Sequence, residues 1–167
     1  MKVCLVASSG GHLRELEFVK YLDMENAEYF LITEKVAGMK ARGYGRVYYV
    51  EQINRKEKGA WAKFLRLIVA GNKILRKEKP DYYISTGAFI SIPILILGKL
   101  RGKKIIFAES FARVEDGSLS GKIAYRFSDL FIVYWKNLLK VYPRAIYVDP
   151  FGGQDDFRNG GDSEVFI

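Results

Sequence analysis

The first stretch that could do chemistry is Ser8–His12, SSGGH, which follows the apolar run Val3–Ala7. A buried strand, a Gly-rich turn and a helix start make an anion site. The free N–H groups of the first helical turn point outward, and the helix dipole favours negative charge. Glycine carries no Cβ that would hold the backbone away from a phosphate oxygen. We therefore predict phosphate or diphosphate contacts at Ser9, Gly10 and Gly11; the alternative is a plain turn whose serines only cap the helix.

Two side chains could move a proton. His12 is the only histidine of the chain, and the ordinary histidine pKa of about 6.5 suits either a proton acceptor or a phosphate contact. Glu109 follows a largely apolar run, where partial desolvation could tune a carboxylate as a base. We predict both as candidate catalytic residues. The alternatives are a histidine that only occupies a helix end or the core, and a glutamate paired with Arg113 or Lys122.

Further anion contacts are predicted after two later strands. Thr86 and Gly87 are predicted to form a second Gly turn, directly after the short strand 81–85 in the sequence. Arg113 and Lys122 lie in a loop and at a helix start. They could clamp an anionic head group, because the planar guanidinium fork of arginine binds phosphate in a bidentate manner. The alternative for both cations is a solvated surface.

Alternating apolar and amphipathic stretches predict the elements that position these residues. The predicted strands are 3–7, 27–33, 46–51, 81–85, 103–108, 130–135 and 145–148, and the predicted helices are 12–22, 60–77, 88–100 and 119–128. Such alternation predicts an α/β fold, a Rossmann-like parallel sheet with helices on both faces. Ligands bind beyond the carboxyl ends of such strands, so Ser8–His12, Thr86–Gly87 and Glu109–Arg113 are expected to converge on one edge.

Length and composition favour a single globular domain. The chain has 167 residues, the size of one α/β domain, and we predict that 1–148 form it and that 149–167 are a tail, flexible or docked on a partner. The one cysteine, Cys4, cannot form an internal disulfide, so a core position and a reducing compartment are expected. A strand that begins at residue 2 predicts no signal peptide. The longest apolar run, Ala88–Leu97, is shorter than the roughly 20 residues of a membrane span.

The net charge of +8 is concentrated in the middle of the chain. Arg55–Lys79 holds nine basic and two acidic residues, so a partner with negative charge is expected to meet it. Its apolar positions are predicted to mark one face of a helix: Trp61, Phe64, Leu65, Ile68 and Leu75. The stretch is either a solvated core helix or a membrane-surface helix. The residues predicted to contact the membrane are Trp61, Lys63, Phe64, Arg66 and Lys73.

The Gly turn matches neither common nucleotide motif. No third glycine completes a GxGxxG pattern, and the Lys-Ser/Thr ending of a P-loop is missing. A nicotinamide-dependent oxidoreductase is therefore disfavoured, and we predict no cofactor and no metal. The aromatic residues fall inside predicted strands and form no RNP or OB pattern, which argues against nucleic acid as a partner.

Several separated motifs together resemble the Alg14-like polysaccharide-biosynthesis family. They are SSGGHL at Ser8–Leu13, STGAF at Ser85–Phe89, ES-AR with S-GK-Y across Glu109–Tyr125, and DLFIVYW followed by Pro143, Ala145 and Tyr147. The resemblance covers about residues 2–148. It implies the N-terminal, acceptor-binding half of a split GT-B glycosyltransferase, similar to the acceptor half of MurG. The functional residues that the resemblance implies for this sequence, by matching residue type, are Gly10, Gly11, His12 and Glu109.

The resemblance also implies a reaction and a partner. A separate Alg13-like subunit would hold the UDP-sugar, and the heterodimer would add a sugar to a lipid-diphosphate-linked saccharide at the cytoplasmic face of the cell membrane, in exopolysaccharide or capsule assembly. Eukaryotic Alg14 has an N-terminal membrane anchor, which this sequence does not show. The expected chemistry is inverting transfer, with His12 or Glu109 as the base. The alternative is a non-catalytic subunit that recruits its partner to the membrane.

Overall fold

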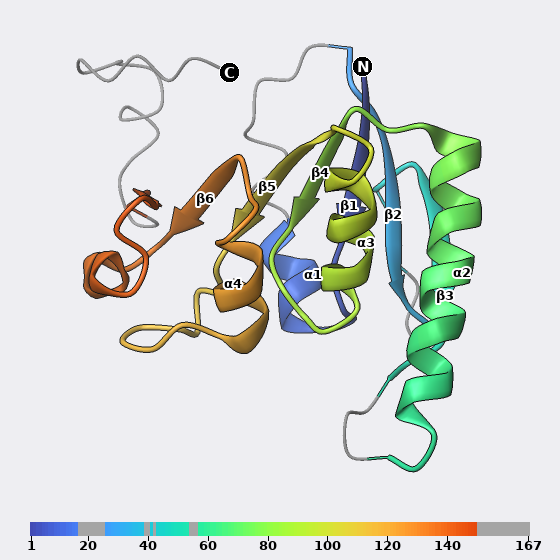
Figure 1. The fold of residues 1–167 in the computed structure, drawn as a ribbon, viewed down its shortest axis with the longest axis horizontal. Helices are drawn as coiled ribbons and strands as arrows, with labels where there is room; N and C mark the ends of the chain where they lie inside the picture. The colour runs from blue at the N-terminus through green and yellow to red at the C-terminus, as the bar shows by residue number, and fades with distance from the viewer. Residues whose placement is uncertain (17–25, 39–40, 42, 54–56, 150–167) are drawn as a thin grey trace.

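Residues 1–16, 26–38, 41, 43–53 and 57–149 are described by a computed structural model (Figure 1). They contain one sheet of seven parallel strands in the order β3-β2-β1-β4-β5-β6-β7. The strands are β1 Lys2–Val6, β2 Glu28–Glu34, β3 Arg46–Val50, β4 Tyr82–Ser85, β5 Lys104–Ala108, β6 Leu130–Val133 and β7 Ile146–Tyr147. The helices are α1 Gly11–Glu15, α2 Ala60–Glu78, α3 Ser91–Lys99, α4 Leu119–Ala124 and the 3₁₀ helix η2 Lys136–Lys140.

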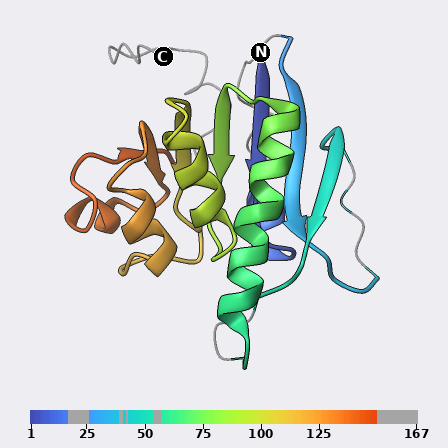
Figure 2. The same cartoon turned by 45° about the vertical axis from the view of Figure 1, so that its right-hand side comes forward.

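Helices cover both faces of the sheet, as predicted. On one face, Leu13 of α1 and Leu16 pack with Val3 and Leu5 of β1. On the other face, α2, α3 and α4 pack against the sheet, and Figure 2 shows α2 lying across its middle. The strand order reverses between β1 and β4. This is the topological switch point of a doubly wound sheet, where ligands bind beyond the carboxyl ends of the strands.

The central strand is buried on both faces. Val3, Cys4, Leu5 and Val6 are at most 2% exposed, with Cys4 and Val6 on the side of α2 and α3 and Val3 and Leu5 on the side of α1. A strand covered on both faces needs apolar residues at every position, which is why its sequence is a continuous run rather than an alternation. The expected core position of Cys4 is confirmed.

Several element boundaries differ from the prediction. The helix expected from residue 88 begins at Ser91, because Gly87 and Ala88 both adopt positive φ, of 115° and 77°, in a turn that precedes it. The alternative in which a serine caps α1 is wrong: the N-cap is Gly10, at φ 97°, with no side-chain cap. Positions 17–22 of the predicted first helix and 150–167 of the predicted tail lie outside the described residues.

The predicted single apolar face of α2 is wrong, because its members lie on different sides of the helix. Leu67, Gly71 and Leu75 are buried, whereas Trp61 and Leu65, which were predicted to share a face with Leu75, are 75% and 58% exposed. Among the described helices, none is both long and apolar enough to cross a membrane.

An ion cluster fastens the opposite, amino-terminal edge of the sheet. Glu78, at the end of α2, is only 4% exposed. Its carboxylate accepts hydrogen bonds from Lys2 Nζ at 3.0 Å, from Arg46 and from the hydroxyl of Tyr48. Burial raises the pKa of Glu78, but these three donors outweigh it and lower the pKa to about 2. The cluster therefore ties α2 to β1 and β3 through one charged group.

We predict that Glu78→Gln lowers the free energy of unfolding at pH 7 by about 1–3 kcal/mol, because Lys2 and Arg46 lose a charged acceptor. The folded-state pKa is depressed, so the contribution is present above the unfolded pKa and is lost as pH falls from about 4.5 toward about 2. Urea unfolding at pH 7 and pH 3 measures both effects. Glu28→Gln is the matched control, since Glu28 pairs with the same Lys2 but is exposed. An equal deficit for Glu78→Gln at both pH values would contradict the prediction.

Candidate functional site

The predicted convergence of three loops is confirmed. β1, β4 and β5 are neighbours in the sheet, so the loops that follow them share its carboxyl edge, the end at which α1 lies in Figure 1. Two of the loops are joined directly at the switch point. Thr86 Oγ1 donates to the His12 carbonyl oxygen at 2.6 Å, and His12 Nδ1 lies 2.9 Å from the Thr86 carbonyl oxygen. His12 and Thr86 thus bridge the two loops in both directions.

The His12 ring is held through Nδ1. Besides the Thr86 carbonyl, the Glu15 carboxylate lies 3.3 Å from Nδ1. Both neighbours accept hydrogen bonds only, so Nδ1 carries the proton in the neutral ring and Nε2 keeps its lone pair. The nearby Glu15 carboxylate raises the pKa of His12 above its ordinary value, although burial opposes it. The side chain is 32% exposed, so a ligand can approach the ring.

Glycines shape the space around this ring. A Cβ on Gly87, at φ 115°, would lie 3.2 Å from His12 Cε1, so the bare backbone of Gly87 lets the imidazole pack against it. A Cβ on Gly10 or Gly11 would have no atom of the described residues within 4 Å. Within this part of the chain, the Gly turn therefore leaves room for a ligand beside its backbone. Ser9 beside it is half-buried.

Glu109 is buried and fully hydrogen-bonded. It is 1% exposed and accepts hydrogen bonds from the backbone N–H groups of Ser110 (2.9 Å) and Ser118 (3.0 Å) and from the Tyr142 hydroxyl (2.8 Å). Burial and this hydrogen bond raise the pKa of the Tyr142 hydroxyl. A Cβ on Gly121 would lie 2.0 Å from Glu109 Oε2. The carboxylate therefore closes the 110–118 loop, and this geometry makes His12 the more accessible of the two predicted bases.

Arg113 and Lys122 do not pair with Glu109. Both are exposed, and within the described ranges the structure records no ion pair for either side chain. The predicted alternative of a Glu109 ion pair is therefore replaced by the contacts with backbone N–H groups. Neither cation is brought into contact with His12 by the described part of the chain.

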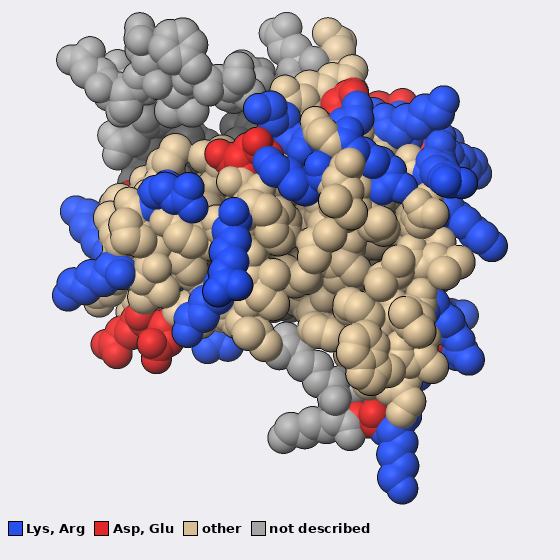
Figure 3. Space-filling model, viewed as in Figure 1, with Lys and Arg blue, Asp and Glu red and all other residues tan. Residues whose placement is uncertain are grey.

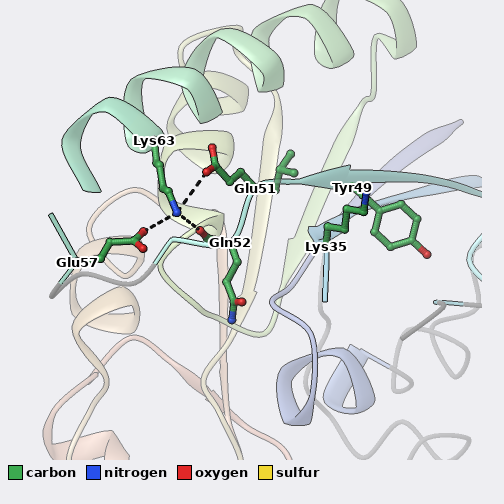
Figure 4. A pocket seen from close by; sticks show the side chains of 7 residues that line it. Lys35, Tyr49, Glu51, Gln52, Glu57 and Lys63 are labelled. Atoms are coloured by element: carbon green, nitrogen blue, oxygen red, sulfur yellow. Dashed lines mark hydrogen bonds and ion pairs between the residues drawn. The ribbon is translucent and has the colours of Figure 1, made fainter. Parts of the chain in front are cut away.

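The predicted membrane residues on α2 fall into two groups. Arg66 and Lys73 are exposed, and Trp61 stacks edge-on against Phe64, with Phe89 beside them, around an apolar hollow of about 410 Å³. Lys63 instead points into a separate hollow of about 640 Å³ (Figure 4). There its Nζ is neutralised by Glu51 and Glu57 and donates to the Gln52 carbonyl.

Sequence reasoning missed Glu15 and Tyr142. Glu15 stands three residues after His12, a spacing that places both on one side of a helical turn, and this was an available signal. Tyr142 lies 33 positions from Glu109 in the sequence, and no local sequence pattern predicts a hydrogen bond between residues so far apart.

The strand order and the switch-point loops define a doubly wound, Rossmann-like α/β fold, which solved structures of two other proteins share. MurG of Acinetobacter baumannii matches with a TM-score of 0.66 and 18% identity, over 81% of this chain and 42% of MurG. A UDP-GlcNAc 2-epimerase of Methanocaldococcus jannaschii matches with a TM-score of 0.64 and 14% identity, over 89% of this chain and 45% of the epimerase. The chain thus spans less than half of either protein, and these likenesses establish the fold.

The family is established by sequence. The chain belongs to the family described as "Oligosaccharide biosynthesis protein Alg14 like", whose model matches residues 3–151. The human UDP-N-acetylglucosamine transferase subunit ALG14 is 29% identical over 178 residues, covering 89% of this chain and 82% of the human protein. The resemblance to the Alg14-like family is therefore confirmed.

We predict that Glu109→Gln lowers the free energy of unfolding by about 1–3 kcal/mol, because an amide leaves one of the three buried donors without an acceptor. Denaturant unfolding measures the loss, and amide hydrogen exchange at Ser110 and Ser118 locates it in the loop. Glu115→Gln, an exposed change in the same loop, is the matched control and should be neutral. Unchanged exchange at both serines in Glu109→Gln would show that the carboxylate does not hold the loop.

Proposed function

We propose that this protein is a subunit of a two-component glycosyltransferase that transfers a sugar from a UDP-sugar to a lipid-diphosphate-linked saccharide in polysaccharide biosynthesis. The human relative is named as a UDP-N-acetylglucosamine transferase subunit, which makes UDP-GlcNAc the first donor to assay. The observation that carries the proposal is His12 at the switch point, with Nδ1 anchored and Nε2 available beside an open Gly turn.

The proposed partner supplies the other half of the active site. Because the chain spans 42% of MurG, an Alg13-like subunit would bind the UDP-sugar across the carboxyl edge of the sheet. The subunits form a heterodimer, and the 149–167 tail is a further candidate for contact with it. This chain contributes the acceptor side, with Ser9, Gly10 and Gly11 at the diphosphate and the exposed cations Arg113 and Lys122 assisting.

The proposed reaction is an inverting displacement. An acceptor hydroxyl gives its proton to His12 Nε2 while its oxygen attacks the anomeric carbon of the donor sugar. The new glycosidic C–O bond forms as the bond to UDP breaks, and UDP leaves with the electron pair, stabilised mainly by the partner. Glu109 shapes the 110–118 loop near the acceptor and, buried with three hydrogen bonds, is assigned the supporting part.

A membrane-facing surface fits a lipid-linked acceptor. Trp61, Leu65 and Val69 are each more than half exposed and recur every four residues along α2, so they form one apolar stripe on its outer side. Figure 3 shows an uncharged face over α2 and α3 with lysine and arginine along its border. We place this stripe, with Arg66 and Lys73, against the cytoplasmic membrane surface, where cations meet anionic lipid and the tryptophan enters the interface.

The stripe also supports a second candidate function. Because it is separate from His12, the chain could anchor a catalytic partner without taking part in catalysis. The two functions differ in whether His12 is needed once the partner is bound.

We predict that His12→Ala lowers sugar transfer by the reconstituted pair about 10²–10⁴-fold, since general-base catalysis contributes that much. The measurement is sugar transfer from a panel of UDP-sugars to a lipid-diphosphate-linked acceptor, with the Alg13-like partner subunit co-expressed. Glu28→Gln, on the opposite edge, serves as the control. Full activity of His12→Ala with partner binding intact would favour the recruiter, and transfer by the purified chain alone would refute the split enzyme.

We predict that the double variant Trp61→Ser, Leu65→Ser binds vesicles of phosphatidylcholine and phosphatidylglycerol at least about tenfold more weakly, because each buried apolar side chain contributes about 1.5–3 kcal/mol. Co-sedimentation at two salt concentrations measures binding and its electrostatic part. The control is Ile146→Ser, an exposed apolar residue on β7. Equal vesicle binding by the double variant and the control would show that α2 does not contact the membrane.

A further inference from the structure

Glu15 connects the histidine loop to the loop after β5. Its Oε1 accepts hydrogen bonds from Ser110 Oγ at 2.8 Å and from the Phe111 N–H group at 3.2 Å. Its Oε2 is buried, has no hydrogen-bond donor assigned among the described residues, and lies 3.3 Å from His12 Nδ1. One oxygen is thus anchored, and the other is aimed at the imidazole.

This arrangement favours a positive charge on His12. A buried carboxylate oxygen without a donor is costly and is stabilised by a nearby cation. When Nε2 takes up a proton, the charge spreads over the ring to Nδ1, beside Glu15 Oε2. The carboxylate therefore stabilises the imidazolium, and it favours the neutral tautomer that leaves Nε2 unprotonated.

Other titratable groups face the same pair. Glu109, directly after β5, interacts with His12 through space and adds to the rise in the pKa of the imidazole. Glu34 at the end of β2 is 8% exposed, and burial raises its pKa while the nearby His12 lowers it. Tyr134, after β6, faces Glu15, and burial together with that carboxylate raises the tyrosine pKa. Among these groups, only Glu15 directly contacts the His12 ring.

We propose that Glu15 is a positioning residue that fixes the His12 ring as an Nδ1–H tautomer and stabilises its protonated form. Its effect on the ring stands on the geometry alone, and its effect on catalysis rests on the proposed function. Because Ser110 and Phe111 hold Oε1, the loop after β5 sets the direction of the carboxylate. The variant Glu15→Gln disturbs this arrangement specifically: an amide whose oxygen still accepts from Ser110 and Phe111 turns its NH₂ group toward the protonated Nδ1.

The single histidine makes the test direct. Long-range ¹H–¹⁵N spectra of the ¹⁵N-labelled full chain report the tautomer and pKa of His12 without interference from another imidazole. We expect the Nδ1–H tautomer in the wild type and a fall in the His12 pKa of about one unit or more in Glu15→Gln. Glu34→Gln, which removes a nearby carboxyl without direct ring contact, should produce a smaller fall. An Nε2–H tautomer in the wild type, or an unchanged pKa in Glu15→Gln, overturns the proposal.

Measurements of sugar-transfer activity test the effect of Glu15 on catalysis separately. In the reconstituted pair we expect Glu15→Gln to lower kcat about 10–100-fold and to move the acid limb of the pH profile to lower pH, because a base with a lower pKa stays unprotonated further into acid. Glu15→Asp should recover part of the rate and of the pKa, and it replaces Glu15→Gln if that variant does not fold. A shifted His12 pKa with an unchanged kcat and pH profile would retain Glu15 as the group that positions the ring, and would refute His12 as the base of the proposed reaction.

Discussion

The reciprocal contact between His12 and Thr86 is the interaction on which the site depends. It joins two loops that leave adjacent strands and then run to opposite sides of the sheet. Without it, Nδ1 would keep only Glu15 as an acceptor, and the loop that carries the Gly turn would lose its direct hydrogen bonds to the loop after β4. The contact exists because β1 and β4 pair in parallel, with Val6 opposite Ser85, so both chains leave the sheet at the same height. The sheet thus determines the geometry of the imidazole.

Much of the fold was predictable because burial imposes a pattern on local sequence. β1 is covered on both faces and is therefore a continuous apolar run, and α2 ends one residue beyond its predicted limit, just before Pro80. The start of α3 was missed because Ala88 is apolar and suits a buried helix, yet its backbone adopts positive φ in the turn before the helix. The apolar residues of α2 were assigned to one face because spacing alone does not separate the side that meets the sheet from a second apolar side that is exposed.

The site was predictable to the extent that its residues follow strands. The Gly turn and His12 stand directly after a buried run, and parallel topology then places them at the edge with Thr86. Glu15 belongs to the same turn, yet its partners Ser110 and Phe111 lie about a hundred positions away, so its alignment depends on tertiary structure. For Glu109, predicted as a candidate base, the alternative of an ion pair with Arg113 or Lys122 is wrong. Its carboxylate accepts hydrogen bonds from backbone N–H groups, because the loop after β5 folds back over the strand end.

The two apolar sides of α2 lead to a consequence for how this protein can vary. Leu67, Gly71 and Leu75 are constrained by the sheet and α3, so changes there are limited by folding. Trp61, Leu65 and Val69 have no such constraint from the described residues, and their exposure leaves them to adapt to whatever the helix touches outside the domain. Under the proposed membrane contact, adaptation to a different lipid composition would change residues on the exposed side of this helix and leave the side that packs on the sheet unaltered.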